Sequence, residues 1–264
     1  MNVTFLIGNG FDLQVGLRTR YIDFYKVYIV PNEKDSPAIL KFKEQILKDE
    51  AHGWRNWSDF ELGMAQQSIY IKRSKDIFAS YFKSHDTKSG VNRFGESWHV
   101  HGRIDDHPIL GVSEAEQIQN EEIRNSQVQR IFVKENYINS LQSQDVNEII
   151  PATRAIKTIE RSRVICIYGA SMGEADKHWW EKIGKWLERG GMLVIFDICG
   201  SKDDGVSPLL SLSSWKITES RRQDIIARFL KLAEIDENWY NSNKIVVEFD
   251  TKMFSFKLPR KSAG

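Results

Sequence analysis

Short runs of β-branched and aromatic residues alternate along this chain with longer stretches of helical period, and this alternation restricts the fold most. The run at 3–7 (VTFLI) ends at Gly8, and similar runs follow at 164–168 (VICIY), 192–198 (MLVIFDI) and 244–249 (KIVVEF). Continuous apolar runs of this length are typical of strands buried on both faces. Strands that alternate with helices predict an α/β protein, a Rossmann-like parallel sheet with helices on both faces.

Apolar residues three and four apart predict a helical layer between Tyr21 and Tyr81, directly after the first strand. We therefore expect one domain over 1–264, with a helical insertion at about 20–85. Two short strands are expected around the turn 103–106, and a loop around Ser207-Pro208 and the serine-rich 211–214. Further helices are expected within 114–162, 174–189 and 220–235.

Charge and cysteine content restrict the partners and the compartment. The 264 residues hold 37 Lys and Arg against 36 Asp and Glu, a formal net charge of +1. Such a balance produces no long-range field that would attract nucleic acid or an anionic membrane, so we expect neither as a partner. The two cysteines lie in apolar runs, which indicates buried thiols in a reducing compartment. With no signal peptide or membrane span in the sequence, we expect a cytoplasmic protein.

The first strand runs into a glycine turn, Gly8-Asn9-Gly10-Phe11-Asp12. The carboxyl ends of parallel strands are where open α/β sheets bind ligands, and glycines there let a phosphate approach the backbone amides. The dinucleotide fingerprint is incomplete, because Leu13 takes the place of the third glycine. A tight turn that only needs glycine for its backbone conformation is the alternative interpretation.

The stretch around this turn, FLIGNGFDLQVGLRTRYIDFY, resembles the opening of the bacteriophage abortive-infection family AbiH. Three later segments fit the family's motifs in order: WSDFE at 57–61, His101-Gly102, and IYGASMGEAD at 167–176. The resemblance implies a sirtuin-like, Rossmann-type sheet and a nucleotide pocket, with NAD as substrate or ligand.

The resemblance also implies roles for individual residues. The GNGFD turn, Gly8 to Asp12, would hold the diphosphate and ribose, and His101 would be the active-site histidine. Gly169 and Ser171 would support the adenosine half, with Asp176 capping a helix or binding a ribose hydroxyl.

One family segment is missing, an asparagine-tyrosine-threonine strand end before the HG motif. Residues 81–98 read YFKSHDTKSGVNRFGESW, which contains Asn92 but no apolar strand. Either the sheet lacks a strand, or Asn92 takes over the catalytic role from a loop, or the catalytic half is defective.

His101 is our candidate for the general base, because an imidazole at a strand end can take a proton from a hydroxyl or a water. An isolated strand histidine that only packs is the alternative interpretation. His99, Asp105, Asp106 and His107 are metal-ligand types, but their spacing fits no compact ligand motif, so we expect no metal.

The GASMG segment at 169–173 also fits the nucleophile elbow of serine hydrolases, with Ser171 as nucleophile and Asp197 as acid. No histidine follows Asp197 to complete that order, since His178 is the last in the chain. We therefore favour Ser171 as a hydrogen-bond donor to a ligand phosphate or ribose.

These features together predict a phage-defence protein that binds a nucleotide and hydrolyses the N-glycosidic bond of NAD. A non-enzymatic nucleotide sensor or interaction module is the alternative, and a metal-dependent hydrolase is less favoured. Self-association, the phage trigger and the true nucleotide are left open by the sequence.

Overall fold

The computed structural model describes residues 2–14, 111–119, 121–127, 129–144, 151–197, 211–236 and 244–251, with single positions at 100 and between 30 and 48. The chain divides into two compact units. Unit 1 comprises 1–20, 161–172 and 179–264, and unit 2 comprises 21–160 and 173–178. Unit 2 thus starts beside the predicted start of the helical insertion and continues well beyond its predicted end.

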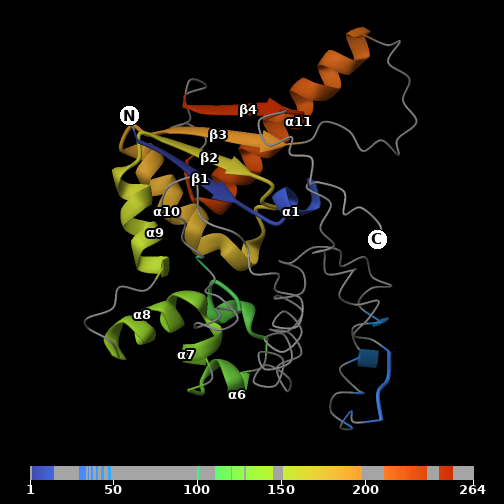
Figure 1. Ribbon diagram of the computed structural model, residues 1–264, viewed down its shortest axis with the longest axis vertical. Helices are drawn as coiled ribbons and strands as arrows, with labels where there is room; N and C mark the ends of the chain where they lie inside the picture. The colour runs from blue at the N-terminus through green and yellow to red at the C-terminus, as the bar shows by residue number, and fades with distance from the viewer. Residues whose placement is uncertain are drawn as a thin grey trace, which may run out of the picture. The chain divides into compact units, whose positions relative to one another are not determined.

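Unit 1 is built on a four-stranded parallel sheet, whose strands lie side by side in chain order in Figure 1. The strands are β1 (Val3–Ile7), β2 (Val164–Tyr168), β3 (Met192–Asp197) and β4 (Ile245–Phe249). In the register, Tyr168 pairs with Ile7 on one side and with Phe196 on the other. The predicted α/β class, the parallel sheet and its Rossmann-like arrangement are confirmed.

Three helices follow strands of unit 1: α1 (Gly10–Gln14), α10 (Lys177–Glu188, whose first two residues belong to unit 2) and α11 (Ser211–Leu232). The links β2–α10–β3 and β3–α11–β4 advance across the sheet in the same direction, so right-handed crossovers put α10 and α11 over the same face. The loop predicted at 211–214 is wrong, because these residues begin α11. Serine favours helix starts as well as turns, which is why composition misled.

The two faces of the sheet are unequally buried. Ile165, Leu193 and Ile245 share one face and are at most 3% exposed. On the opposite face, Val3 and Phe5 are more than 40% exposed. Cys166 and Tyr168 lie on that opposite face as well and are at most 7% exposed, so the core reaches both faces at β2. The prediction that the strand at 3–7 is buried on both faces is wrong, because one face of β1 is exposed.

Tight packing fixes the short turn that links α10 to β3. The buried Trp186 donates its indole N–H to the Ser162 carbonyl at 2.8 Å. A Cβ at Gly191 would lie 2.4 Å from the Trp186 ring, so only glycine fits against the indole. Trp179 and Trp180 are also buried and belong to the core.

Unit 2 is helical in its described part, as its polar, helix-favouring sequence predicts. It contains η2 (Ala115–Gln117), α6 (Glu121–Arg124), α7 (Gln129–Phe132), α8 (Lys134–Gln144), α9 (Pro151–Arg161, whose last residue belongs to unit 1) and η3 (Glu174–Asp176). A parallel bridge between Val112 and Val133 joins the segment before η2 to the start of α8.

Several predictions fall outside the described residues. They concern most of the helical layer between Tyr21 and Tyr81, the strands expected around the turn 103–106, and Cys199. Cys166 is described and is a buried free thiol, as predicted, and burial raises its pKa. Within the described part of the chain, no helix combines the length and apolar character needed to cross a membrane.

Candidate functional site

Two turns lie in contact where β1 and β2 end. The first turn comprises residues 8–12, and the second turn comprises residues 169–172. The Gly8 amide donates to the Tyr168 carbonyl and the Gly10 amide to the Gly169 carbonyl, each at 2.8 Å. Figure 1 shows the first turn leading from the tip of β1 into α1. These turns occupy the edge of the sheet at which open α/β proteins bind ligands.

Glycine is required in both turns because their backbones approach each other closely. A Cβ at Gly8 would lie 2.6 Å from the Ala170 Cα, and one at Gly10 would lie 2.6 Å from the Gly169 Cα. Gly169 itself has a φ of +65° and faces the amide of Phe11. Any side chain at these positions would push the turns apart.

The amides of the first turn are largely used within the protein. Besides Gly8 and Gly10, the Phe11 amide donates to the Gly8 carbonyl at 3.1 Å. The glycines of GNGFD thus allow the two turns to pack together, which differs from the expectation that they expose amides to a phosphate.

The second turn has the properties expected of an anion site. The amides of Ala170, Ser171 and Met172 donate to no group in the described part of the chain. Ser171 is exposed and its hydroxyl makes no hydrogen bond there either. Met172 is buried with a φ of +49°, a left-handed conformation that a non-glycine residue rarely adopts. Successive amides around a left-handed residue form a concave site for anions.

Three aromatic side chains and one carboxylate lie at or next to the turns. Phe11 and Tyr168 contact edge to face, with ring centroids 6.4 Å apart, and Phe196 extends this group at 6.1 Å from Tyr168. Asp12 lies in α1, and burial raises the pKa of its carboxyl. Burial likewise raises the pKa of Tyr168.

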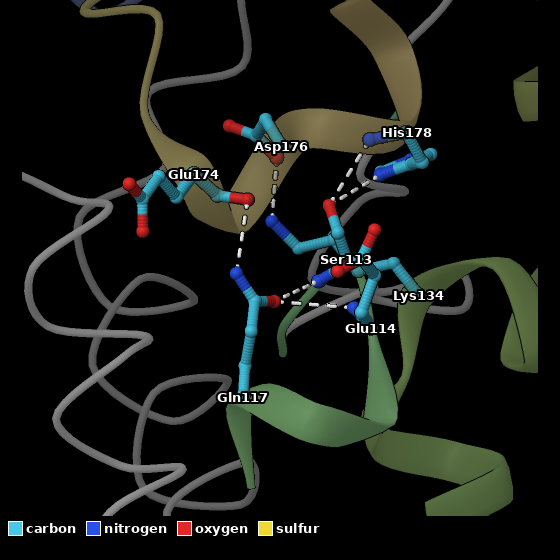
Figure 2. Close-up of polar contacts among 7 residues, drawn as sticks. All are labelled: Ser113, Glu114, Gln117, Lys134, Glu174, Asp176 and His178. Atoms are coloured by element: carbon cyan, nitrogen blue, oxygen red, sulfur yellow. Dashed lines mark hydrogen bonds and ion pairs between the residues drawn. The ribbon is translucent and has the colours of Figure 1, made fainter. Parts of the chain in front are cut away.

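A second group of polar contacts lies within unit 2 and is drawn in Figure 2. The Ser113 hydroxyl accepts the backbone N–H of His178 at 3.1 Å and lies 3.1 Å from its Nδ1. Both residues are buried. Because His178 is the second residue of α10, Ser113 caps that helix and holds the imidazole in place.

Asp176, predicted to bind the ligand, forms an ion pair with Lys134 in the same group (Figure 2). The Lys134 Nζ lies 2.6 Å from Oδ1, and the lysine side chain has no exposed surface. Nearby, Lys177 pairs with Glu114 at 2.7 Å. Sequence reasoning missed Lys134, although a lysine directly after the apolar run 131–133 (IFV) is a signal that could have found it.

Gln117 completes the group (Figure 2). Its Oε1 accepts the amides of Ser113 and Glu114, and its Nε2 donates to the Glu174 carbonyl at 3.3 Å. The residues 174–178 are therefore held by side chains from 113–134. This arrangement stabilises the start of α10.

The remaining predicted site residues divide in two. Asn92 and His101 lie outside the described residues, as do His99 and the acidic turn after it, so their roles stay predictions. Ser171 has no histidine partner in the described part of the chain, and Asp197 pairs with Arg221. The serine-hydrolase alternative therefore gains no support from the geometry.

Comparison with known proteins gives one family match, and it covers the first turn but not the second. The family model described as Bacteriophage abortive infection AbiH matches residues 4–97. The match confirms the predicted resemblance to AbiH over a segment that includes the GNGFD turn, and it supports a role in abortive infection of bacteriophage. The motifs at His101-Gly102 and at 167–176 lie outside the matched segment. No curated protein and no solved structure matches the chain.

Proposed function

We propose that this chain binds the diphosphate of a nucleotide at the second turn and hydrolyses the nicotinamide N-glycosidic bond of NAD during abortive infection. The observation that carries the proposal is the set of unused amides at Ala170, Ser171 and Met172, at the carboxyl end of β2. Backbone amides and a hydroxyl are the donors that phosphate oxygens need.

The first turn supports this site by packing against the second turn. Gly8 and Gly10 let it pack against the second turn, and that packing fixes the left-handed backbone of the second turn at Gly169 and Met172. A donor set that is already in place loses little conformational entropy when the anion binds. Asn9, Phe11 and Asp12 belong to the same first turn, and we assign them to the wall of the pocket.

Hydrolysis requires water to add at C1′ of the ribose while nicotinamide leaves, through an oxocarbenium-like state. His101 would accept the proton of the water, and Asn92 would orient the water or the ribose. The products are nicotinamide, ADP-ribose and one proton. Loss of NAD would stop growth of the infected cell, which is the outcome that abortive infection demands.

A nucleotide sensor without catalytic activity is the second candidate. The observation that favours it is the missing asparagine-tyrosine-threonine segment between residues 81 and 98. Such a sensor would keep the two turns and bind the nucleotide without consuming it.

Cellular NAD distinguishes the two candidates. Induced expression of the wild type should lower NAD and arrest growth, and His101→Ala should do neither, because loss of a general base costs roughly 10²-fold or more in rate. Asn92→Ala should resemble His101→Ala. If NAD stays constant during wild-type expression, both with and without phage, the glycohydrolase proposal is wrong and the sensor is the better account.

A further inference from the structure

The end of β3 carries an ion pair next to the second turn. Asp197 is the last residue of β3, directly after Phe196, which pairs with Tyr168 of β2. Asp197 therefore comes one residue after the partner of Tyr168, and the second turn begins one residue after Tyr168 itself. Its Oδ2 accepts two hydrogen bonds from Arg221 of α11, from Nε at 3.3 Å and from Nη2 at 3.2 Å.

The Asp197 carboxylate is held in place through only one of its two oxygens. The Asp197 carbonyl accepts the amide of Asp250, which fixes the strand end, and Arg221 binds Oδ2 alone. The other oxygen, Oδ1, makes no hydrogen bond or ion pair in the described part of the chain. The Asp197 side chain is 36% exposed, so a ligand can reach it.

From this geometry we infer that Asp197, positioned by Arg221, selects nucleotides whose ribose has a free 2′-hydroxyl. The inference rests on the proposed binding of a diphosphate at the second turn. A ribose joined to that diphosphate reaches the neighbouring strand end, where Oδ1 accepts a hydrogen bond from its hydroxyl. A 2′-phosphate at the same place would meet the carboxylate, and like charges repel.

Because of Arg221, removal of the Asp197 carboxylate should shift the nucleotide preference from NAD towards NADP. A guanidinium binds phosphate through paired N–H groups, and here two of its nitrogens are directed at Asp197. When the carboxylate is removed, those donors become available to a 2′-phosphate. Arg222, the next residue, is engaged elsewhere, with the Val247 carbonyl and the Phe249 ring, so it does not substitute for Arg221.

The test is the affinity of the full chain for NAD and for NADP, measured by calorimetry. All the proteins carry His101→Ala, so that NAD is not hydrolysed: one is otherwise wild type, one has Asp197→Asn and one has Asp197→Ala. The otherwise wild-type protein should prefer NAD. Asp197→Ala should lower the affinity for NAD about tenfold or more, because a charge-assisted hydrogen bond is lost. The same substitution should raise the affinity for NADP. Asp197→Asn removes the repulsion at constant shape, so it should strengthen NADP while retaining part of the NAD affinity.

Glu248→Gln is the matched control. Glu248 is exposed on β4, pairs in register with Phe196 and so lies on the opposite face from Asp197, yet the substitution removes the same charge. It should leave the ratio of NAD to NADP affinity unchanged. An equal change in Glu248→Gln and Asp197→Asn, or an unchanged ratio in Asp197→Ala with NAD still bound, would overturn the inference. A wild type that binds neither NAD nor ADP-ribose would instead overturn the proposed function.

Discussion

Gly10 shows how a single position in a binding turn can be required for folding before it is required for function. Its Cβ would lie 2.6 Å from the Gly169 Cα, so even alanine meets backbone that has no rotamer to change. We expect Gly10→Ala to lower the free energy of unfolding by about 1–3 kcal/mol, the usual cost of overpacking. Denaturant unfolding followed by circular dichroism measures this. A Gly10→Ala protein as stable as the wild type would mean that the two turns are not packed as described.

Burial of the Asp12 carboxyl makes the stability of the protein depend on pH. Burial raises the pKa of its carboxyl above its ordinary value of 3.8, so the folded state binds the proton more tightly than the unfolded chain does. Stability due to this group is therefore greatest below pH 3.8 and falls as pH rises through the raised pKa. Asp12→Asn should stabilise the protein at neutral pH.

The same substitution should make no difference in acid, where Asp12 is protonated in both states. Thermal unfolding of the two proteins at several pH values checks the sign. A stability difference that grows as pH falls would contradict the assignment.

Asp176 and Lys134 test whether the polar group of unit 2 is structural. Asp176→Ala removes a carboxylate 2.6 Å from an ammonium with no exposed surface, which should cost about 3 kcal/mol of stability. Lys134→Met keeps the volume and removes the charge, so it should cost less. Unfolding free energies of the two variants provide the comparison. Equal costs would show that the buried charge is not the source of the effect.

At the scale of elements, the α10–β3 link offers a matched pair of glycines. A Cβ at Gly191 would collide with the Trp186 ring, whereas one at Gly190 would have nothing within 4 Å. Gly190 has a φ of +100°, so alanine there costs about 1 kcal/mol of backbone strain. Gly191→Ala should be the more destabilising of the two in thermal unfolding. The reverse order would contradict the packing of Trp186.

The four strands could be predicted from sequence because each is a short apolar run that ends at a glycine, a charge or a turn. The start of α11 could not, since Ser211 and its neighbours fit a loop as well as a helix start. Part of the site could be predicted from the sequence in the same way, because Gly8, Gly10, Gly169 and Ser171 follow strands. Whether their amides are used within the protein depends on how the two turns pack, which no local pattern encodes.

The long-range ion pairs could not be predicted from the sequence for a different reason. Asp197 and Arg221 lie 24 positions apart, and Lys134 and Asp176 lie 42 apart. Their meeting depends on crossover handedness and helix placement rather than on spacing. Each of these residues is unremarkable in its own segment, apart from the lysine directly after an apolar run.

For the whole molecule, the sheet of unit 1 supports the proposed anion site at the second turn, which lies outside residues 4–97, the segment that matches the AbiH family model. The near-neutral net charge of +1 means that a nucleotide is not attracted over long distances. Affinity must therefore come from the donors of the second turn and the groups beside it.

The most direct test of this claim is the affinity of the purified full chain for ADP-ribose, measured by isothermal titration calorimetry on the wild type and on Ser171→Ala. Ser171 is exposed and forms no hydrogen bond in the described part of the chain, so the substitution should leave stability unchanged. The account predicts one ADP-ribose per chain and an affinity about tenfold or more lower in Ser171→Ala, because a hydrogen bond to a charged phosphate is lost. Absence of binding to the wild type, or equal affinity in the two proteins, would contradict it.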